Sequence, residues 1–140
     1  MAIRVVRLGT TRSPREGIRL GTVRRLPRGV RKTDYARLDF FDLWLPELAP
    51  SPKLFSWARS VELTGARWTR YAKAYRREMQ HPAAQRLLTL LALLSRQSNF
   101  SVGCYCERED RCHRSILRKL LTEHDGKMAE KITRGIHSAY

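Results

Sequence analysis

The sequence predicts a small single-domain α/β sandwich in which a mostly parallel sheet is flanked by helices. Two observations predict this fold: strand-like segments come before and after a run of helical ones, and the last strand-like segment is followed by a turn and a helix. This order favours a layered α/β fold over a helical bundle. A chain of 140 residues is long enough for one core without disulfides or metals. We expect residues 1–125 to form the domain and residues 126–140 to be a poorly ordered polar tail.

The N-terminal third is predicted to supply two strands. Residues 3–8 alternate apolar residues with arginines, and residues 18–23 form a second strand-like run. The Leu-Pro-Arg-Gly sequence at 26–29 then indicates a turn. Residues 39–48 mix aromatic and acidic residues, which predicts a short strand or an irregular segment that packs its rings on the core.

Three helices are predicted in the middle of the chain. Ser51 is a suitable N-cap and Pro52 suits the first position of a helix that continues through residues 53–60. A second helix is expected at residues 66–80, and Pro82 opens a third, leucine-rich one that reaches residue 97. The second helix carries one stripe at helical spacing, which indicates core packing rather than base stacking: Trp68, Tyr71, Ala72, Tyr75 and Met79.

A strand, a loop and a helix close the predicted domain. Residues 100–106 indicate a strand, and the charged loop after it ends at Asp110, which suits the N-cap of a helix from Arg111. Cys112 falls on the apolar face of this helix, whereas His113 and Arg114 fall off it.

The charge of the chain is strongly basic. The 28 Lys and Arg residues against 13 acids give +15, and since only six of the 28 are lysines, 22 are arginines. Arginine binds phosphates and carboxylates through two parallel hydrogen bonds, so an anionic small molecule or a nucleic acid is an expected partner. A solvated basic surface is the alternative. The N-terminus has no signal-peptide core and no stretch is apolar enough to span a membrane, so we expect a cytoplasmic protein without a membrane partner.

The candidate functional site is the turn from Cys104 to Arg114. A loop that leads from a strand into a helix N-terminus is where α/β folds bind ligands, and the free N–H groups there favour an anion. The same helix end would lower the pKa of Cys112 and favour its thiolate. The turn therefore predicts an anion site with Arg114 as a ligand of the anion. If the site is catalytic, Cys112 or Cys106 is the expected nucleophile and His113 the expected acid or base.

Two other roles remain open for the cysteines, of which all three lie within nine residues. The set Cys104, Cys106, Cys112 and His113 would suit zinc or iron, although adjacent helical residues point apart and the usual Cys-x2-Cys spacing is absent. Cysteines on an apolar face can also simply pack in the core. The leading expectation is therefore a site without a cofactor. The Cys-x5-Arg loop of phosphatases does not fit, because Cys112 stands where that pattern requires arginine after Cys106.

Several motifs resemble the YeaO-like family, also known as domain of unknown function 488, over residues 3–121. The motifs that carry the resemblance are Arg7, Gly17-x-Arg19, Arg24, Pro27-Arg28-Gly29, Lys32-Thr33-Asp34, Trp44, Pro50-Ser51, Tyr71-x3-Tyr75-x2-Glu78-Met79, Cys104-x-Cys106 and Cys112-His113-Arg114. The sequence departs from the family at Leu26, where a Trp is usual, and at Val23, where an acid is usual. Some members keep only the histidine of the cysteine-histidine set. The resemblance implies an α/β fold and does not by itself imply a reaction.

The resemblance also suggests how the basic residues are used. If the N-terminal strands neighbour the strand at 100–106, their ends converge on the helix that begins near Cys112. The expected anion ligands are then Arg7, Arg19, Arg24, Arg28 and Lys32, together with Arg114. Two alternatives belong to other classes: a non-catalytic nucleic-acid-binding module that uses the arginine-rich N-terminal third, and a Cys/His metal-binding protein.

Overall fold

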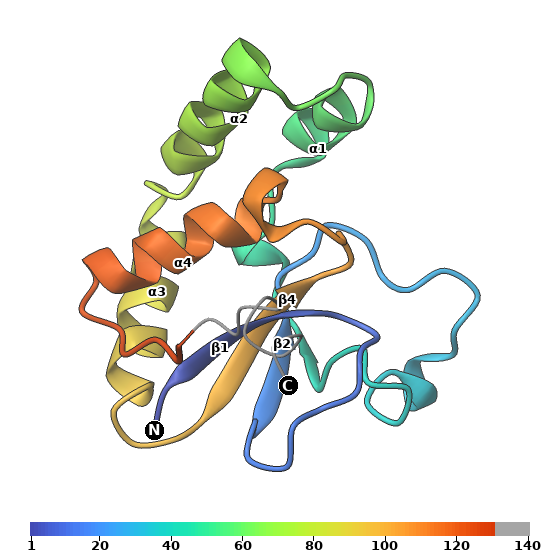
Figure 1. Ribbon diagram of the computed structural model, residues 1–140, viewed down its shortest axis with the longest axis vertical. Helices are drawn as coiled ribbons and strands as arrows, with labels where there is room; N and C mark the ends of the chain where they lie inside the picture. The colour runs from blue at the N-terminus through green and yellow to red at the C-terminus, as the bar shows by residue number, and fades with distance from the viewer. Residues whose placement is uncertain (131–140) are drawn as a thin grey trace, which may run out of the picture.

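The computed structural model describes residues 1–130, so most of the predicted polar tail, residues 131–140, lies outside the described residues. The strands and helices follow one another in the order that the sequence predicts, and Figure 1 shows their arrangement. In chain order the elements are β1 (Ile3–Arg7), β2 (Ile18–Gly21), β3 (Leu43–Trp44), α1 (Pro52–Arg59), α2 (Gly65–Glu78), α3 (Pro82–Leu94), β4 (Phe100–Cys104) and α4 (His113–Glu123). None of the helices within residues 1–130 has the length and apolar character needed to cross a membrane.

The described strands form one parallel sheet in the order β1-β4-β2-β3. Ile3 pairs with Phe100 at one end of the β1–β4 ladder and Arg7 pairs with Cys104 at the other, while Gly21 of β2 pairs with Gly103. Because the pairings are parallel, the carboxyl ends of β1, β2 and β4 lie at one edge of the sheet. The predicted small α/β domain with a parallel sheet is confirmed.

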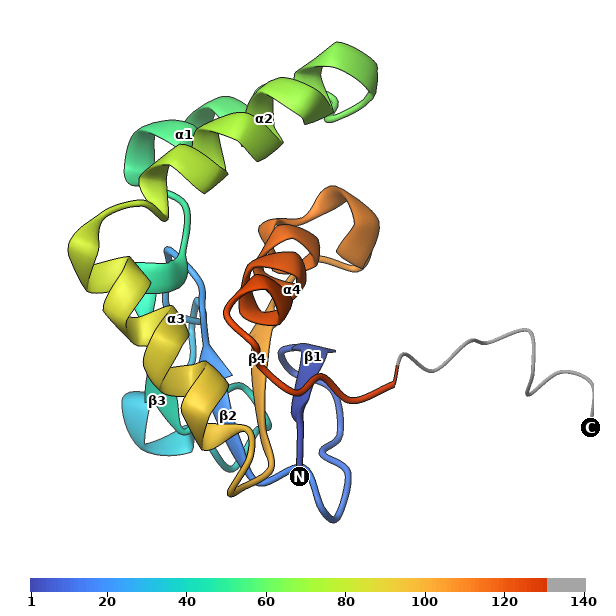
Figure 2. The same ribbon diagram turned by 90° about the vertical axis from the view of Figure 1, so that its left-hand side faces the viewer.

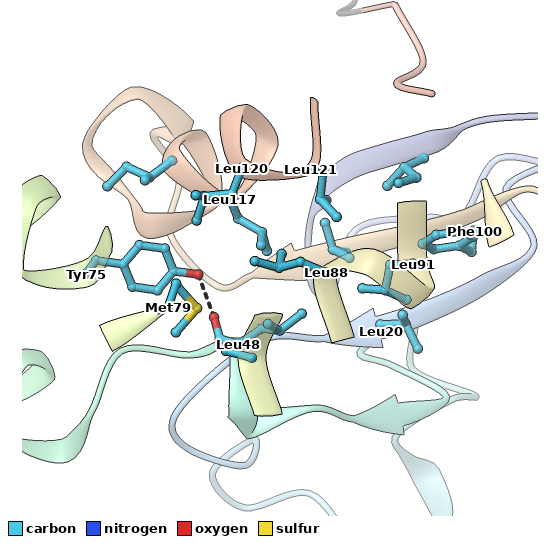
Figure 3. Packing of buried hydrophobic residues seen from close by; sticks show 14 of the residues in the cluster. Leu20, Leu48, Tyr75, Met79, Leu88, Leu91, Phe100, Leu117, Leu120 and Leu121 are labelled. Atoms are coloured by element: carbon cyan, nitrogen blue, oxygen red, sulfur yellow. Dashed lines mark hydrogen bonds between the residues drawn. The ribbon is translucent and has the colours of Figure 1, made fainter. Parts of the chain in front are cut away.

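One face of the sheet is covered by α3 and α4. The buried leucines of these helices pack with sheet residues and with Tyr75 of α2 in one hydrophobic cluster, part of which Figure 3 shows. The Tyr75 hydroxyl, which is fully buried, donates a hydrogen bond of 2.7 Å to the carbonyl oxygen of Leu48. The aromatic stripe of α2 is therefore core at Tyr71, Tyr75 and Met79, as its spacing predicts.

The opposite face of the sheet carries a buried ion pair. Arg19 of β2 donates from Nε to Glu16 at 2.7 Å, and Ser101 of β4 donates to the same carboxylate at 2.6 Å. Burial alone would raise the pKa of the Glu16 carboxyl, but hydrogen bonds from Arg19 and Ser101, together with the Arg19 charge, hold it below its usual value. The second Arg19 nitrogen, Nη1, donates to the carbonyl oxygens of Thr10 and Asp39, so the pair also fixes the loops that cover this face.

The start of the last helix differs from the prediction. Residues 109–111 form a single 3-10 turn, Cys112 is extended at φ −127° and ψ 150°, and α4 begins at His113. Asp110 does not cap the helix, because its carboxylate accepts two hydrogen bonds from the Arg108 guanidinium instead. The strand before it is also shorter than expected and ends at Cys104, not at residue 106.

The chain after α4 returns to the sheet. Ile3 donates to the carbonyl oxygen of Lys127, and Ala129 donates to the carbonyl oxygen of Ile3, both at 2.8 Å. Lys127 also donates to the Ser95 hydroxyl at the end of α3. The first residues of the predicted tail thus add to the edge of β1.

Candidate functional site

A cavity of about 360 Å³ lies at the carboxyl edge of the sheet, between the ends of β2 and β4 and the helix α1. Figures 1 and 2 show α1 and α2 beyond this end of the sheet, where α4 begins. The lining combines arginines, apolar side chains, the three cysteines and a histidine: Val23, Arg24, Arg25, Pro50, Phe55, Ala58, Arg59, Leu63, Tyr71, Cys104, Tyr105, Cys106, Arg111, Cys112 and His113. Its volume is within the range of small-ligand pockets.

The three cysteines form one cluster in this wall. Their Sγ atoms all lie within 4.8 Å of one another, and Cys104 Sγ is 3.7 Å from Cys106 Sγ. Cys104 ends β4 and Cys112 precedes α4, and both are buried, whereas Cys106 is exposed. None of the three forms a disulfide. Cys106 is therefore the thiol that a molecule in the cavity can reach.

Within the cluster the pKa of one thiol is lowered and the pKa values of the other two are raised. Hydrogen bonds from Cys104 and Cys112 stabilise the Cys106 thiolate and hold its pKa far below the usual value. The hydrogen bonds of Cys104 to its two neighbours and its burial raise the pKa of that thiol. For Cys112, a hydrogen bond with Cys104 lowers the pKa, but the contact with Cys106 and burial outweigh it and raise the pKa to about 12. The prediction of a lowered pKa at Cys112 is wrong, because this residue is buried beside a neighbouring thiolate.

His113 is buried at the first position of α4, with a relative exposure of 4%. Its Nε2 lies 2.6 Å from the carbonyl oxygen of Thr22, which can only accept, so Nε2 bears a proton. Its Nδ1 lies 3.7 Å from Cys112 Sγ, next to the thiol cluster. The sequence pattern put His113 and Arg114 off the buried face of the helix, and that prediction is wrong for both. They precede the buried residues Ile116, Leu117, Leu120 and Leu121 by three, four or seven positions and therefore share their face. The His113 ring lies 5.4 Å from that of Tyr75 in α2.

Arg114 is also buried, with a relative exposure of 3%. Its Nη2 donates to the carbonyl oxygen of Cys106, so it holds the loop that presents the exposed thiol. Its Nε is buried without a hydrogen-bond partner in the described part of the chain, as is the Nε of Arg111. Buried donors of this kind are normally satisfied by water or a ligand.

The arginines that line the cavity are held by rings and carbonyls rather than by carboxylates. The guanidinium groups of Arg25 and Arg59 lie 4.9 Å and 5.5 Å from the centre of the Phe55 ring, and that of Arg111 lies 5.5 Å from Trp68. Elsewhere, arginines such as Arg12, Arg19 and Arg118 form close ion pairs. Among the described residues, no acid lines the cavity, and the only carboxylate within 4 Å of a lining arginine is 3.9 Å from Arg111. The described lining of the cavity therefore contains guanidinium groups and no carboxylate.

Two of the predicted anion ligands from the N-terminal third lie at or beside the cavity. Arg24 lines it, although its Nε and Nη2 donate to the carbonyl oxygens of Pro50 and Pro46. Arg28 is exposed and lines a neighbouring hollow of about 320 Å³ that shares Arg25, Phe55, Arg59 and Tyr105 with the cavity.

The other three lie elsewhere. Arg19 is fully buried in its pair with Glu16, and its partners are all within the protein. Arg7 ends β1 and donates from Nε to the carbonyl oxygen of Tyr105, next to Cys106 in the chain, but it does not line the cavity. Lys32 is exposed in a short 3-10 turn and does not line the described cavities. Of the five basic residues from the N-terminal third that were expected near the start of the last helix, only Arg24 and Arg28 line the cavity or the hollow beside it.

Three lining arginines were absent from the expected anion ligands: Arg25, Arg59 and Arg111. Arg25 follows Arg24 directly, and Arg111 lies inside the Cys104–Arg114 turn, so both had a signal in the sequence. Arg59 ends α1. Its position at the cavity depends on how α1 packs over the sheet, which no local pattern indicates.

A second hollow, of about 710 Å³, lies between α1 and α2. Its described lining includes four basic side chains, Lys53, Arg70, Lys73 and Arg77, and one acid, Glu78, but no cysteine or histidine. It offers charge without an evident reactive group, so it is a candidate binding surface rather than a candidate active site.

The comparisons with known proteins point to one family. The family model DUF488-N3a, described as the active DUF488-N3 subclade, matches residues 3–125. The match includes the whole sheet, the helices α1 to α4 and all residues of the cavity. No curated protein and no solved structure matches the chain. The resemblance inferred from the motifs is confirmed.

Proposed function

The chain belongs to the DUF488-N3a family, and we propose that it is an enzyme whose cavity binds a phosphate-bearing, nucleotide-like anion beside Cys106. The observation that supports this most directly is the composition of the cavity: its described lining has four arginines, no acids, apolar walls and three clustered thiols. A guanidinium group binds phosphate oxygens through paired hydrogen bonds, and apolar walls favour an anion joined to a planar apolar group over free phosphate. The description of the family as an active subclade is consistent with catalysis.

The roles of the individual residues follow from their accessibility. Arg59 and Arg111 are the proposed anion ligands, because neither is closely paired with a carboxylate and both border the space. Cys106 is the candidate nucleophile, since it is the exposed thiol and its pKa is low. Arg114 orients the Cys106 loop through the backbone carbonyl.

Calorimetric titration with adenosine 5′-monophosphate, inorganic phosphate and adenosine tests the proposal. We expect the nucleotide to bind more tightly than either part alone. Replacing Arg59 by Ala removes a charged hydrogen-bond donor, which should cost about 1.5–3 kcal/mol, roughly a 10- to 100-fold loss of affinity. Arg86→Ala is the matched control, because Arg86 is an exposed helical arginine of α3 outside the cavity. Equal affinity of the two variants, or no binding of any probe, would contradict the proposal.

A second candidate function, nucleic-acid binding, is favoured by the hollow between α1 and α2. Its four basic side chains and the stacking of Arg70 on the Trp57 ring at 4.5 Å suit a phosphate backbone. Binding of a labelled oligonucleotide should then weaken steeply with salt, and Lys73→Ala should reduce the salt dependence while leaving nucleotide binding unchanged. An affinity for the oligonucleotide that does not depend on salt would exclude this use of the hollow.

A further inference from the structure

The thiol cluster has the spacing of a metal centre. From its geometry we propose that Cys104, Cys106 and Cys112 bind one Zn²⁺ ion through their Sγ atoms. His113 Nδ1, which lies 3.7 Å from Cys112 Sγ but is not one of the three clustered donors, would become the fourth ligand after a small side-chain adjustment. The inference concerns the cluster alone and does not depend on which ligand enters the neighbouring cavity.

The distances between the donor atoms support this assignment. Tetrahedral zinc with Zn–S bonds of about 2.3 Å and a Zn–N bond of about 2.0 Å requires S···S separations of about 3.8 Å and S···N separations of about 3.6 Å. Cys104 and Cys106 are separated by 3.7 Å between sulfurs, and His113 Nδ1 is 3.7 Å from Cys112 Sγ. All three sulfurs lie within 4.8 Å of one another. The side chain of Cys106 is exposed, so it can rotate toward a common centre while its backbone stays in place.

The position of the proton on His113 also fits a metal ligand. Since Nε2 donates its proton to the Thr22 carbonyl oxygen, the neutral ring has its lone pair on Nδ1, the nitrogen beside the thiols. Zinc-bound histidines are usually oriented in this way, with the second ring nitrogen donating to a backbone carbonyl or a carboxylate.

The backbone at Cys112 removes the main objection from the sequence. Two adjacent residues of a helix point apart, which argued against Cys112 and His113 sharing one ion. Cys112, however, is extended and lies just outside α4, and its Sγ is 3.7 Å from His113 Nδ1. The Cys106 loop is fixed in turn by the bond from Arg114 to the Cys106 carbonyl oxygen.

The arginines around the cluster would favour the net negative charge of a zinc ion bound by three thiolates. Three thiolates and one Zn²⁺ leave a net charge of −1, which the arginines of the cavity and the buried Arg114 would offset. Because a zinc-bound thiol is deprotonated outright, the ion would also keep the exposed Cys106 sulfur in its thiolate form beside the cavity. Zinc is favoured over iron, since a Cys3His set is a usual tetrahedral zinc site.

Elemental analysis of the full chain, purified from zinc-supplemented medium, tests the inference first. We expect stoichiometric zinc, and we expect replacement by Co²⁺ to give the intense visible bands of tetrahedral coordination with a thiolate charge-transfer band in the near ultraviolet. A protein that contains no zinc, takes up none when Zn²⁺ is added and shows three freely titrating thiols would overturn the inference.

Variants show whether the ion sits at the proposed residues. Cys106→Ser is the primary variant, because this side chain is exposed and its loss should not disturb folding, which circular dichroism verifies. It should reduce bound metal from stoichiometric to trace amounts. His113→Ala should shift the Co²⁺ bands and weaken binding, whereas His124→Ala, at the other end of α4, should not. Retention of full metal content and an unchanged spectrum in both Cys106→Ser and His113→Ala would refute the site even if nucleotide binding persists.

Discussion

The ion pair between Glu16 and Arg19 is the feature whose removal should cost most stability. Glu16→Gln keeps the size of the side chain but removes its charge. In the wild type one carboxylate oxygen accepts from Arg19 Nε at 2.7 Å and from Ser101 at 2.6 Å, and the other accepts from Arg19 Nη2 at 3.0 Å and from the backbone of Ser13. An amide has only one accepting oxygen, so its NH2 group must face two of these donors.

The magnitude follows from the burial of both partners. The side chains of Arg19 and Glu16 have relative exposures of 1% and 3%, so the variant leaves a cation uncompensated away from water. Breaking a buried pair in this way costs about 3–5 kcal/mol. For a domain of this size the expected fall in melting temperature is roughly 10–20 °C. Thermal and urea unfolding followed by circular dichroism measure both quantities.

Glu123→Gln provides the matched control. Glu123 also makes two hydrogen bonds with one arginine, Arg76, but at the surface, where such a pair contributes at most about 1 kcal/mol. If Glu16→Gln and Glu123→Gln lose equal stability, or if Glu16→Gln is within about 1 kcal/mol of the wild type, burial does not determine the strength of the pair and the reasoning is refuted.

Three further predictions concern stability. Because the folded pKa of Glu16 lies below its unfolded value of about 4.5, the stability that its carboxylate contributes is complete above pH 4.5 and is lost as the pH falls through the folded pKa. Between pH 5 and 2 the urea midpoint should therefore fall less in Glu16→Gln than in the wild type. Tyr75→Phe leaves the buried Leu48 carbonyl without its donor and should cost about 1–3 kcal/mol by urea unfolding. Gly103→Ala would place a Cβ 2.9 Å from the Val6 carbonyl oxygen, so the β1–β4 ladder must shift and the melting temperature should fall.

Each of these has an outcome that contradicts it. An equally steep acid transition in wild type and Glu16→Gln would mean that other groups set the acid limit. A Tyr75→Phe variant of unchanged stability would show that water satisfies the Leu48 carbonyl. Wild-type stability in Gly103→Ala would mean that the neighbouring strand moves without strain. Gly29→Ala is not a suitable control for this variant, because Gly29 has a positive φ of 73° and alanine would be strained there for a different reason.

The sequence predicts the regular elements well where local chemistry decides them. Ser51 accepts a hydrogen bond from the backbone of Leu54, and Pro52 opens α1, as the Ser-Pro pair indicates. The start of α4 was misplaced because an acid before a helix looks like a cap, whereas the Asp110 carboxylate instead binds Arg108, two residues away. Local patterns indicate which groups are available, and the fold selects among them.

The candidate site shows the same limit more clearly. The turn that bears the cysteines could be located from the sequence, because it joins a strand-like run to a helical one. The exact positions could not, since β4 ends at Cys104 and Cys112 precedes α4 instead of belonging to it. Which arginines line the cavity and which are buried in ion pairs could not be predicted from the sequence, since this depends on their tertiary partners. Arg19 belongs to the core because Glu16 and Ser101 enclose it, while Arg59 reaches the cavity only because α1 packs over the edge of the sheet.

The distribution of carboxylates links the two proposals for the site. With 28 basic residues and 13 acids, most cations of this chain have no acid to pair with, and the fold decides where they gather. It pairs Arg19 with Glu16 on the far face of the sheet, and no acid of residues 1–130 lines the cavity. The two proposals place negative charge at that wall, one on the thiol cluster and the other on a ligand. A zinc-thiolate centre and a bound phosphate would both supply it, and both would draw on the same arginines.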